Sequence, residues 1–280
     1  MPGIDRASLA DVLKQAGALA MQGFDPGRTG SGWEKAPNQP VTESDIAVDR
    51  FLRDALGDLD PHAGWLSEES HARPAEGRGA GVWIVDPIDG TRDFIRGRPG
   101  WALSVAYCVD GQPQLGALYA PARAELWLAE AGSGAQRNGK TIIASRQEAL
   151  IGARVPTAQL AKVDRALVAV DKPNSIALRM AMVAADEADL VATLRWGHAW
   201  DVAAALLIAQ ESGALCTDAL GKAMDFKDSD APIFGLLCSA KGIHQAARAH
   251  LESRAQTVLD SHPHGLSAAA MRRHEDSDRV

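Results

Sequence analysis

The sequence predicts a mixed α/β fold with two halves that meet near residues 146–160. Segments with the apolar spacing of helices alternate with short apolar runs, and this alternation is most regular in the second half. Of the 280 residues, 46% are hydrophobic, which is enough for a large core. We expect an N-terminal α+β half over 1–150, a C-terminal α/β half over 151–260 and a mobile tail over 261–280.

The first half is expected to open with two helices and continue as a sheet. One-sided apolar spacing predicts a helix over 5–22, and Thr42 and Ser44 offer N-caps for another over 44–56. The Gly- and Pro-rich stretch 24–40 between them predicts a loop. Apolar runs separated by turn residues predict a buried strand and then an antiparallel sheet, at 82–86, 102–109, 114–120, 125–130 and 140–145.

In the second half, short apolar strands alternate with helical segments. Helices are expected at 175–185, 201–212 and 243–255, and strands at 166–170, 189–194, 214–217 and 235–239. This order is typical of an α/β arrangement.

The charge and hydropathy exclude several classes of function. Lys and Arg number 29 against 36 Asp and Glu, a net charge of −7, which argues against a nucleic-acid polymer as partner. No apolar run approaches the ~20 residues of a membrane span, and the first 24 residues lack the pattern of a secretion signal. Cys108, Cys216 and Cys238 are widely spaced and form no CxxC pair, so we expect buried, reduced thiols in a cytoplasmic protein.

The strongest local motif is WIVDPIDGT at 83–91. A buried strand delivers Asp86 at its end, Pro87 is expected to stop the ladder, and Asp89 follows across a tight turn. Two carboxylates so close repel each other unless a cation lies between them, and the segment holds no Lys or Arg. Oxygen ligands favour hard ions such as Mg²⁺, Mn²⁺ or Ca²⁺. Taken alone, the pair is explained better by a strand end followed by a helix cap.

Three further acids stand at the ends of predicted elements. Glu68 follows the apolar pair Trp65-Leu66, Asp201 opens an Ala/Leu-rich helix, and Asp45 lies in a Thr-x-x-Asp pair. Capping alone accounts for Asp45 or Asp201. Together with Asp86 and Asp89, these acids indicate a shared cation site.

Two long motifs resemble the signatures of the inositol monophosphatase superfamily. They are WIVDPIDGT with the following Phe94, and WDVAAALLIAQESG at 200–213; VTESD, SEES and GALYAP occur in the family's order, from about residue 5 to 250. The resemblance implies a layered α/β/α/β/α sandwich and a Mg²⁺-dependent, typically lithium-sensitive phosphomonoesterase. Homodimers are common in the family, although no stretch of this sequence specifies a subunit face.

The resemblance also implies roles for individual residues. Two or three Mg²⁺ ions, replaceable by Mn²⁺, would be held by Glu68, Asp86, Asp89, Asp201 and the backbone carbonyl of Ile88. Thr91 and Asp45, with Glu68, would activate the attacking water, and attack would be in line. The substrate is expected to contact Asp89, Gly90, Thr91, Ser175, Ala177, Arg195 and Asp201.

The substrate is a small phosphate ester whose identity stays open. A glutamate that contacts inositol in the family is replaced by Leu194. The motifs SEES, DGTRDF and GALYAP are similar to those of bacterial 3'(2'),5'-bisphosphate nucleotidases. We therefore favour adenosine 3',5'-bisphosphate, with Arg195 or Lys172 at its second phosphate and Trp196 beside the base. The alternative is an inositol-1-monophosphatase or a phosphatase of many sugar and polyol phosphates.

Other signals are weaker. Residues 134–141 fit the P-loop spelling GxxxxGKT, but the β-branched residues after Lys140 and the Asn138-Gly139 pair favour a hairpin. A structural Ca²⁺ site in a binding module is a remote alternative. The ligands of such a site cluster within about twelve residues, whereas the acids of this chain are spread from residue 45 to residue 201. Lys35 could close over the cleft, and His198 could contact it; both are equally compatible with ordinary surface residues.

Overall fold

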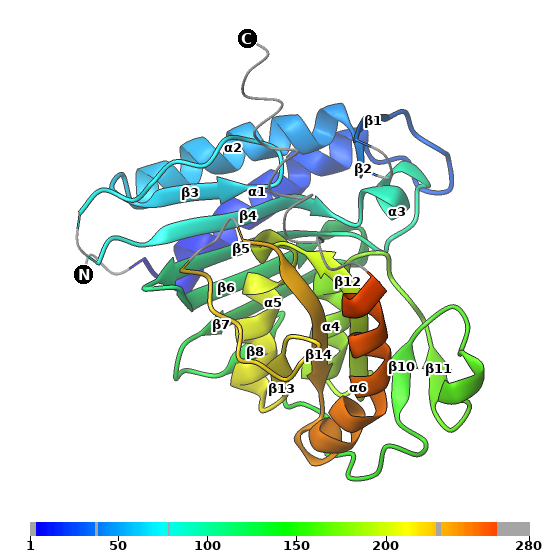
Figure 1. Cartoon of the computed structure of the whole chain (residues 1–280). Helices are drawn as coiled ribbons and strands as arrows, with labels where there is room; N and C mark the ends of the chain where they lie inside the picture. Colours follow the sequence, from blue (N-terminus) through cyan, green and yellow to red (C-terminus); the bar gives the residue numbers. More distant parts are fainter. Residues whose placement is uncertain (1–3, 37–38, 78, 228–230, 262–280) are drawn as a thin grey trace.

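The computed structural model describes residues 4–36, 39–77, 79–227 and 231–261, and these form five stacked layers (Figure 1). A pair of helices covers one face of a large sheet, two further helices cover its other face, and a second sheet and a last helix complete the stack. The predicted α/β/α/β/α sandwich is confirmed. The tail predicted over 261–280 lies outside the described residues, except for Ser261.

The first layer consists of α1 (Arg6–Gly23) and α2 (Glu43–Leu59). Their apolar residues recur every three or four positions, so each helix buries one stripe against the sheet. In α2 this stripe includes Val48, Leu52 and Leu56, all 0% exposed. Packing of this stripe fixes the start of α2 near the end of the sheet, which positions the site described below.

The large sheet has seven strands, and only its first pair is parallel. In spatial order the strands are β3 (Gly64–Ser67), β4 (Val82–Asp89), β5 (Ala102–Val109), β6 (Gln112–Ala120), β7 (Glu125–Glu130), β8 (Ala135–Arg137) and β9 (Lys140–Thr141). The strand expected at 140–145 therefore ends early. Between β4 and β5 lies the short helix α3 (Thr91–Ile95), and η1 (Pro121–Arg123) follows β6.

Two sequence expectations near the sheet are corrected. The loop expected over 24–40 contains a small hairpin of β1 (Trp33–Ala36) and β2 (Gln39–Val41). β4 does not stop at Pro87: its register with β5 shifts between Asp86 and Asp89, and a bulge absorbs the proline.

The hairpin expected at Asn138-Gly139 is confirmed. Arg137 pairs with Lys140 across the turn, and the turn residues have φ of 51° and 75°, as a tight two-residue turn requires. A strand and not a helix follows Gly139, so the P-loop interpretation is wrong.

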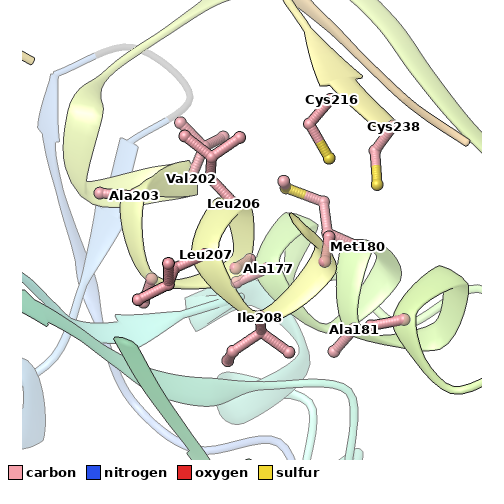
Figure 2. Packing of buried hydrophobic residues seen from close by; sticks show 14 of the residues in the cluster. Ala177, Met180, Ala181, Val202, Ala203, Leu206, Leu207, Ile208, Cys216 and Cys238 are labelled. Atoms are coloured by element: carbon pink, nitrogen blue, oxygen red, sulfur yellow. The ribbon is translucent and has the colours of Figure 1, made fainter. Parts of the chain in front are cut away.

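The middle layer consists of α4 (Ile176–Ala184) and α5 (Ala199–Ser212). Since α5 lies between two sheets, it is buried on nearly every side, as its Ala- and Leu-rich sequence permits. Met180 of α4 belongs to the same buried cluster as Cys216 and Cys238 (Figure 2). These two cysteines and Cys108 are free and buried, as predicted.

The second sheet carries three antiparallel strands in the order β12 (Leu190–Gly197), β14 (Ile233–Ser239) and β13 (Leu215–Thr217). Helix α6 (His244–Ser261), preceded by η3 (Lys241–Ile243), packs against β12 and β14. Beside them, β10 (Arg154–Pro156) and β11 (Val168–Val170) form a parallel pair, with η2 (Lys162–Asp164) between them. Within the described residues, no helix is long and apolar enough to cross a membrane.

Candidate active site

The predicted acids come from five segments that end at the same region of the molecule. Glu68 follows β3, and Asp86 and Asp89 lie at the end of β4. Asp45 lies in the first turn of α2 and Asp201 in the first turn of α5. Burial, followed by the charges of Glu68, Asp89, Asp201 and Asp45, raises the pKa of Asp86 well above its usual value. Five carboxylates therefore act on one another in a buried region.

Asp45 is held by a capping box at the start of α2. Its carboxylate accepts hydrogen bonds from the Thr42 backbone N–H at 2.8 Å and hydroxyl at 2.5 Å. Burial raises the pKa of Asp45 to about 6, although the bonds from Thr42 oppose the rise. The other carboxylate oxygen lies 3.4 Å from the Thr91 hydroxyl, which also lies 3.1 Å from the Ile88 carbonyl oxygen. The structure thus brings together the pair predicted to handle the attacking water.

Asp89 does not cap the helix that follows it. Its carboxylate reaches across to the start of α4, where it accepts hydrogen bonds from the Ser175 hydroxyl at 2.5 Å and the Ala177 N–H at 2.8 Å. Burial raises the pKa of Asp89 to about 6, against these hydrogen bonds. Ser175 and Ala177 are both 0% exposed. The Ser175 hydroxyl and the Ala177 amide thus donate to Asp89 in this structure. That these two residues also contact the substrate stays a prediction.

Asp201 lies at the third position of α5, within its first turn, and caps the helix there as part of a capping box with His198. The helix begins at Ala199, and the His198 backbone N–H donates to the Asp201 carboxylate at 2.7 Å. Burial and the charge of Glu68 raise the pKa of Asp201 to about 8. A Cβ on Gly197 would lie 3.1 Å from the carboxylate, so the glycine leaves space beside it.

Gly90 allows the backbone at the end of β4 to approach the backbone at the start of α4 closely. Its φ is +96°, and a Cβ there would lie 2.8 Å from the Ser175 backbone nitrogen. A glycine is therefore required between Asp89 and Thr91 for β4 to meet the start of α4. The predicted contact of the Gly90 and Thr91 amides with phosphate stays a prediction.

Lys35 and Glu69 are site residues whose connection the sequence reasoning missed. The Lys35 ammonium donates to Glu68 at 2.9 Å and also to Glu69. Burial raises the pKa of Glu69 to about 7, and its side chain is only 4% exposed. The available signal was the pair of consecutive acids directly after a strand, which brings two carboxylates close enough to share one cation. A cation from β1 thus contacts Glu68, which is predicted to hold a metal ion, and its neighbour Glu69.

The donors fit a hard divalent cation. All the charged donors are carboxylates, and the Ile88 carbonyl lies among them, whereas Zn²⁺ prefers imidazole and thiolate. Their mutual repulsion and the ammonium of Lys35 beside Glu68 indicate that the region attracts positive charge. Among the described residues, no three acidic, histidine or cysteine side chains form a ready-made cage, and Mg²⁺ is usually bound by one or two carboxylates with water completing its shell.

Asp89 and Asp201 line a pocket of about 1120 Å³ that is otherwise rich in cations. The predicted contacts Lys172, Arg195 and Trp196 line it, as do the unpredicted Arg92 and Arg179. Leu194 is not among the lining residues; it packs against a small core cluster that contains Phe234, as Trp196 also does. His198 lines the pocket and stacks on Trp200 with ring centroids 4.4 Å apart.

Comparisons with known proteins point to a single family. The model of the inositol monophosphatase family matches residues 6–262. A fructose-1,6-bisphosphatase/inositol-1-monophosphatase of Thermotoga maritima is 34% identical over 65% of this chain and 72% of its own. A histidinol-phosphatase of Chlorobaculum parvum is 33% identical over 76% of this chain and 85% of its own. A solved IMPase structure from Thermotoga maritima has a TM-score of 0.77 and 29% identity, covering 89% of this chain and 97% of the other.

These relatives correct the order of the two substrate hypotheses. They do not bear out a particular closeness to bisphosphate nucleotidases, and they support the alternative of an inositol or broad sugar-phosphate phosphatase better. Phosphatase activity on a small phosphorylated substrate is common to both hypotheses.

Proposed function

This chain belongs to the inositol monophosphatase family, and from this premise we propose that it is a Mg²⁺-dependent phosphatase of small sugar or polyol phosphates. That it is a phosphoric monoester hydrolase follows from the family. The metal, the site residues and the substrate are the parts that we propose. The observation that supports them most is that four neighbouring carboxylates, together with burial, raise the pKa of Asp86.

We assign the metal ligands to the acids at the end of the large sheet. Glu68, Asp86 and Asp89 would hold the ions with Asp201 and the carbonyl of Ile88. Bound Mg²⁺ would supply a nucleophilic hydroxide near neutral pH and would neutralise charge on the leaving alkoxide. Mn²⁺ is expected to substitute, and lithium to inhibit.

Thr91 and Asp45 would orient the attacking water and accept its proton. The Thr91 hydroxyl lies 3.4 Å from the Asp45 carboxylate. If it donates its proton there, its oxygen is left to accept a hydrogen bond from the water and to orient it. The carboxylate, whose pKa burial raises to about 6, is suited to receive a proton near neutral pH.

Inositol 1-phosphate is the first substrate to test, and adenosine 3',5'-bisphosphate is the second. The relatives favour the former, while the pocket cations Lys172 and Arg195 favour the latter. Leu194 also favours a substrate other than inositol, because leucine cannot hydrogen-bond a polyol.

A panel assay tests the proposal. Phosphate release from nucleotide, inositol and sugar phosphates is measured with Mg²⁺, with Mn²⁺, with added lithium and with EDTA. We expect hydrolysis of at least one ester that EDTA abolishes and Mg²⁺ restores. Hydrolysis that is insensitive to EDTA would contradict the metal assignment.

A further inference from the structure

Three hydrogen-bond donors at the start of α4 hold the Asp89 carboxylate. One of its oxygens accepts from the Ser175 hydroxyl and the Ala177 N–H, and the other accepts from the Ile176 N–H at 3.3 Å. The first turn of a helix favours a negative charge, so these donors suit a carboxylate. Because they belong to three consecutive residues, the place of the carboxylate depends on the backbone of this one turn.

The segment that leads into these donors, residues 173–175, is bonded to Arg179. This arginine lies one turn after Ser175 on α4. Its guanidinium donates to three successive backbone carbonyls, those of Pro173, Asn174 and Ser175, at 3.0, 2.5 and 3.2 Å. A guanidinium suits this task because its N–H donors have fixed directions in one plane. One side chain thus fixes three peptide units directly before the donors to Asp89.

The first half of the chain holds the amide groups of the same segment. The Asn174 N–H donates to the carboxylate of Asp93, a buried residue of α3, at 3.0 Å. The Ser175 N–H donates to the Gly100 carbonyl at 2.9 Å. A Cβ on Gly100 would lie 2.1 Å from the Asp93 carboxylate, so the glycine leaves the space that this carboxylate occupies. The amides of the segment are therefore bonded to the first half of the chain and its carbonyls to Arg179.

We propose that Arg179 is a positioning residue for the metal site: it holds residues 173–175 so that the start of α4 places the Asp89 carboxylate to bind an ion. This inference rests on the proposed function and deepens it, because Asp89 is one of the metal ligands assigned there. Arg179 acts through Asp89 and touches neither the ion nor the ester.

Binding of Mn²⁺ to the purified protein tests this without turnover. The ion is titrated into the protein in the absence of any ester, and free Mn²⁺ is measured by electron paramagnetic resonance. We expect Arg179→Met to weaken the ion that Asp89 would hold about tenfold or more, as is usual when the support of a metal ligand is lost. The ion expected near Glu68 should keep its affinity. An unchanged titration curve would overturn the inference.

A double variant tests whether Arg179 acts through Asp89. In the Asp89→Asn background the ligand charge that Arg179 places is already absent. Adding Arg179→Met should therefore leave the Mn²⁺ binding that remains unchanged, whereas independent effects would add. A further loss of affinity in the double variant would contradict the proposal.

Arg179→Lys separates position from charge. The charge of Arg179 also acts on Asp89, and lysine retains it. However, a single ammonium cannot reproduce the planar fork that spans three carbonyls. We therefore expect Arg179→Lys to recover only part of the Mn²⁺ affinity that Arg179→Met loses. Full recovery would show that charge alone is required, and Arg179 would then not be a positioning residue.

Arg154→Met is the matched control for a loss of stability alone. Arg154 belongs to the same half of the chain, and its guanidinium bonds the buried Asp189. Its removal should lower the melting temperature in EDTA but leave the affinity for Mn²⁺ unchanged. If Arg154→Met weakens Mn²⁺ binding as much as Arg179→Met does, both act through general destabilisation and the inference is wrong.

The wild-type titration separates this inference from the proposed function. If wild-type protein binds no Mn²⁺, the metal assignment of the proposed function fails and the inference fails with it. If wild-type protein and Arg179→Met bind the ions equally tightly, the proposed function stands and the inference alone is overturned. A raised KM for the ester with unchanged Mn²⁺ affinity would assign Arg179 to substrate binding, which also refutes the positioning role.

Discussion

Two regions of this protein bury carboxylates to the same extent but shift their pKa values in opposite directions. Asp189 and Asp86 are each 2% exposed. Asp189 accepts hydrogen bonds from the Arg154 guanidinium at 2.7 and 3.0 Å and from the Ser145 hydroxyl. Although burial opposes it, these hydrogen bonds lower the pKa of Asp189, whereas burial and neighbouring acids raise that of Asp86.

The difference distinguishes a structural acid from a functional one. The chain supplies the counter-charge of Asp189, so that site is complete when the protein folds. In the part of the chain that the structure describes, Asp86, Asp89 and Asp201 form no ion pair with a basic side chain, and the charges of Arg179 and Lys35 offset the high pKa of Asp89 and Asp201 only in part. Folding therefore leaves much of the repulsion among these acids in place until a cation arrives. On this account, substitution should affect stability in the first region and activity in the second.

The largest expected effect is on activity. Asp89→Asn or Asp201→Asn should reduce phosphatase kcat about a thousandfold or more, because each removes a charge that would hold a metal ion. The melting temperature should stay the same or rise, since the neutral amide relieves repulsion. Assays with saturating Mg²⁺ and thermal melts measure both. Asp11→Asn, on the exposed face of α1, is the control, and near-normal turnover in either site variant would contradict the assignment.

The next effect is on stability. Asp189→Ala should lower the free energy of unfolding by about 2 kcal/mol, because it leaves the buried Ser145 hydroxyl and the partly exposed Arg154 guanidinium without their shared partner. Turnover per folded molecule should be retained. Urea unfolding measures the change, and Asp186→Asn is the control: Asp186 pairs with the same arginine, but its side chain is 59% exposed, and asparagine tolerates its φ of +59°. If the control costs as much as Asp189→Ala, burial is not what distinguishes this acid.

The two regions should also respond oppositely to pH. The pKa of Asp201 is about 8 in the folded protein, so the folded state binds a proton that the unfolded state releases. Without divalent ions, stability should therefore rise as pH falls from 9 to 6, and Asp201→Asn should reduce this slope. The lowered pKa of Asp189 has the opposite sign: its stabilisation is lost as pH falls below its unfolded value of about 4.

Melting temperatures measured across pH with EDTA and with Mg²⁺ check this prediction. Mg²⁺ needs ionised carboxylates, so it should stabilise the protein most at the alkaline end. A metal-free protein whose stability falls between pH 9 and 6 would contradict the account of the acid cluster.

The smallest expected effect is on metal-free stability and concerns Lys35. Its ammonium contacts Glu68 and Glu69 and so neutralises part of their charge when no metal ion is bound. Lys35→Gln should lower metal-free stability by about 1 kcal/mol, and by less once Mg²⁺ neutralises the same acids. Lys14→Gln, whose side chain is 56% exposed and pairs with Asp11, should change neither value appreciably. An equal loss with and without Mg²⁺ would show that Lys35 is merely structural.

Features set by local sequence could be predicted. The Thr42 and Asp45 spacing defines a capping box without reference to the rest of the chain. The Asn138-Gly139 turn and the apolar stripes of the helices are likewise local, and they yielded the layers of the fold once the family resemblance was recognised. The motif around Asp86 was recognisable because strand, proline and glycine occur within nine residues.

Features set by long-range packing could not be predicted. The bond between Ser175 and Asp89 joins residues 86 positions apart, and the contact of Lys35 with Glu68 spans 33. Neither residue spacing nor composition specifies how these segments meet. The bulge that carries β4 past Pro87 also depends on the partner strand, so the expectation that the proline ends the ladder was wrong.

Diffraction from crystals soaked in Mn²⁺ tests the central claim most directly. The account predicts at least two anomalous peaks within about 2.5 Å of carboxylate oxygens, one near Glu68 and Asp86 and one near Asp89 and Asp201. Asp189, whose counter-charge is already Arg154, should show none. A protein that hydrolyses phosphate esters in Mn²⁺ but shows no peak at these four acids would contradict it.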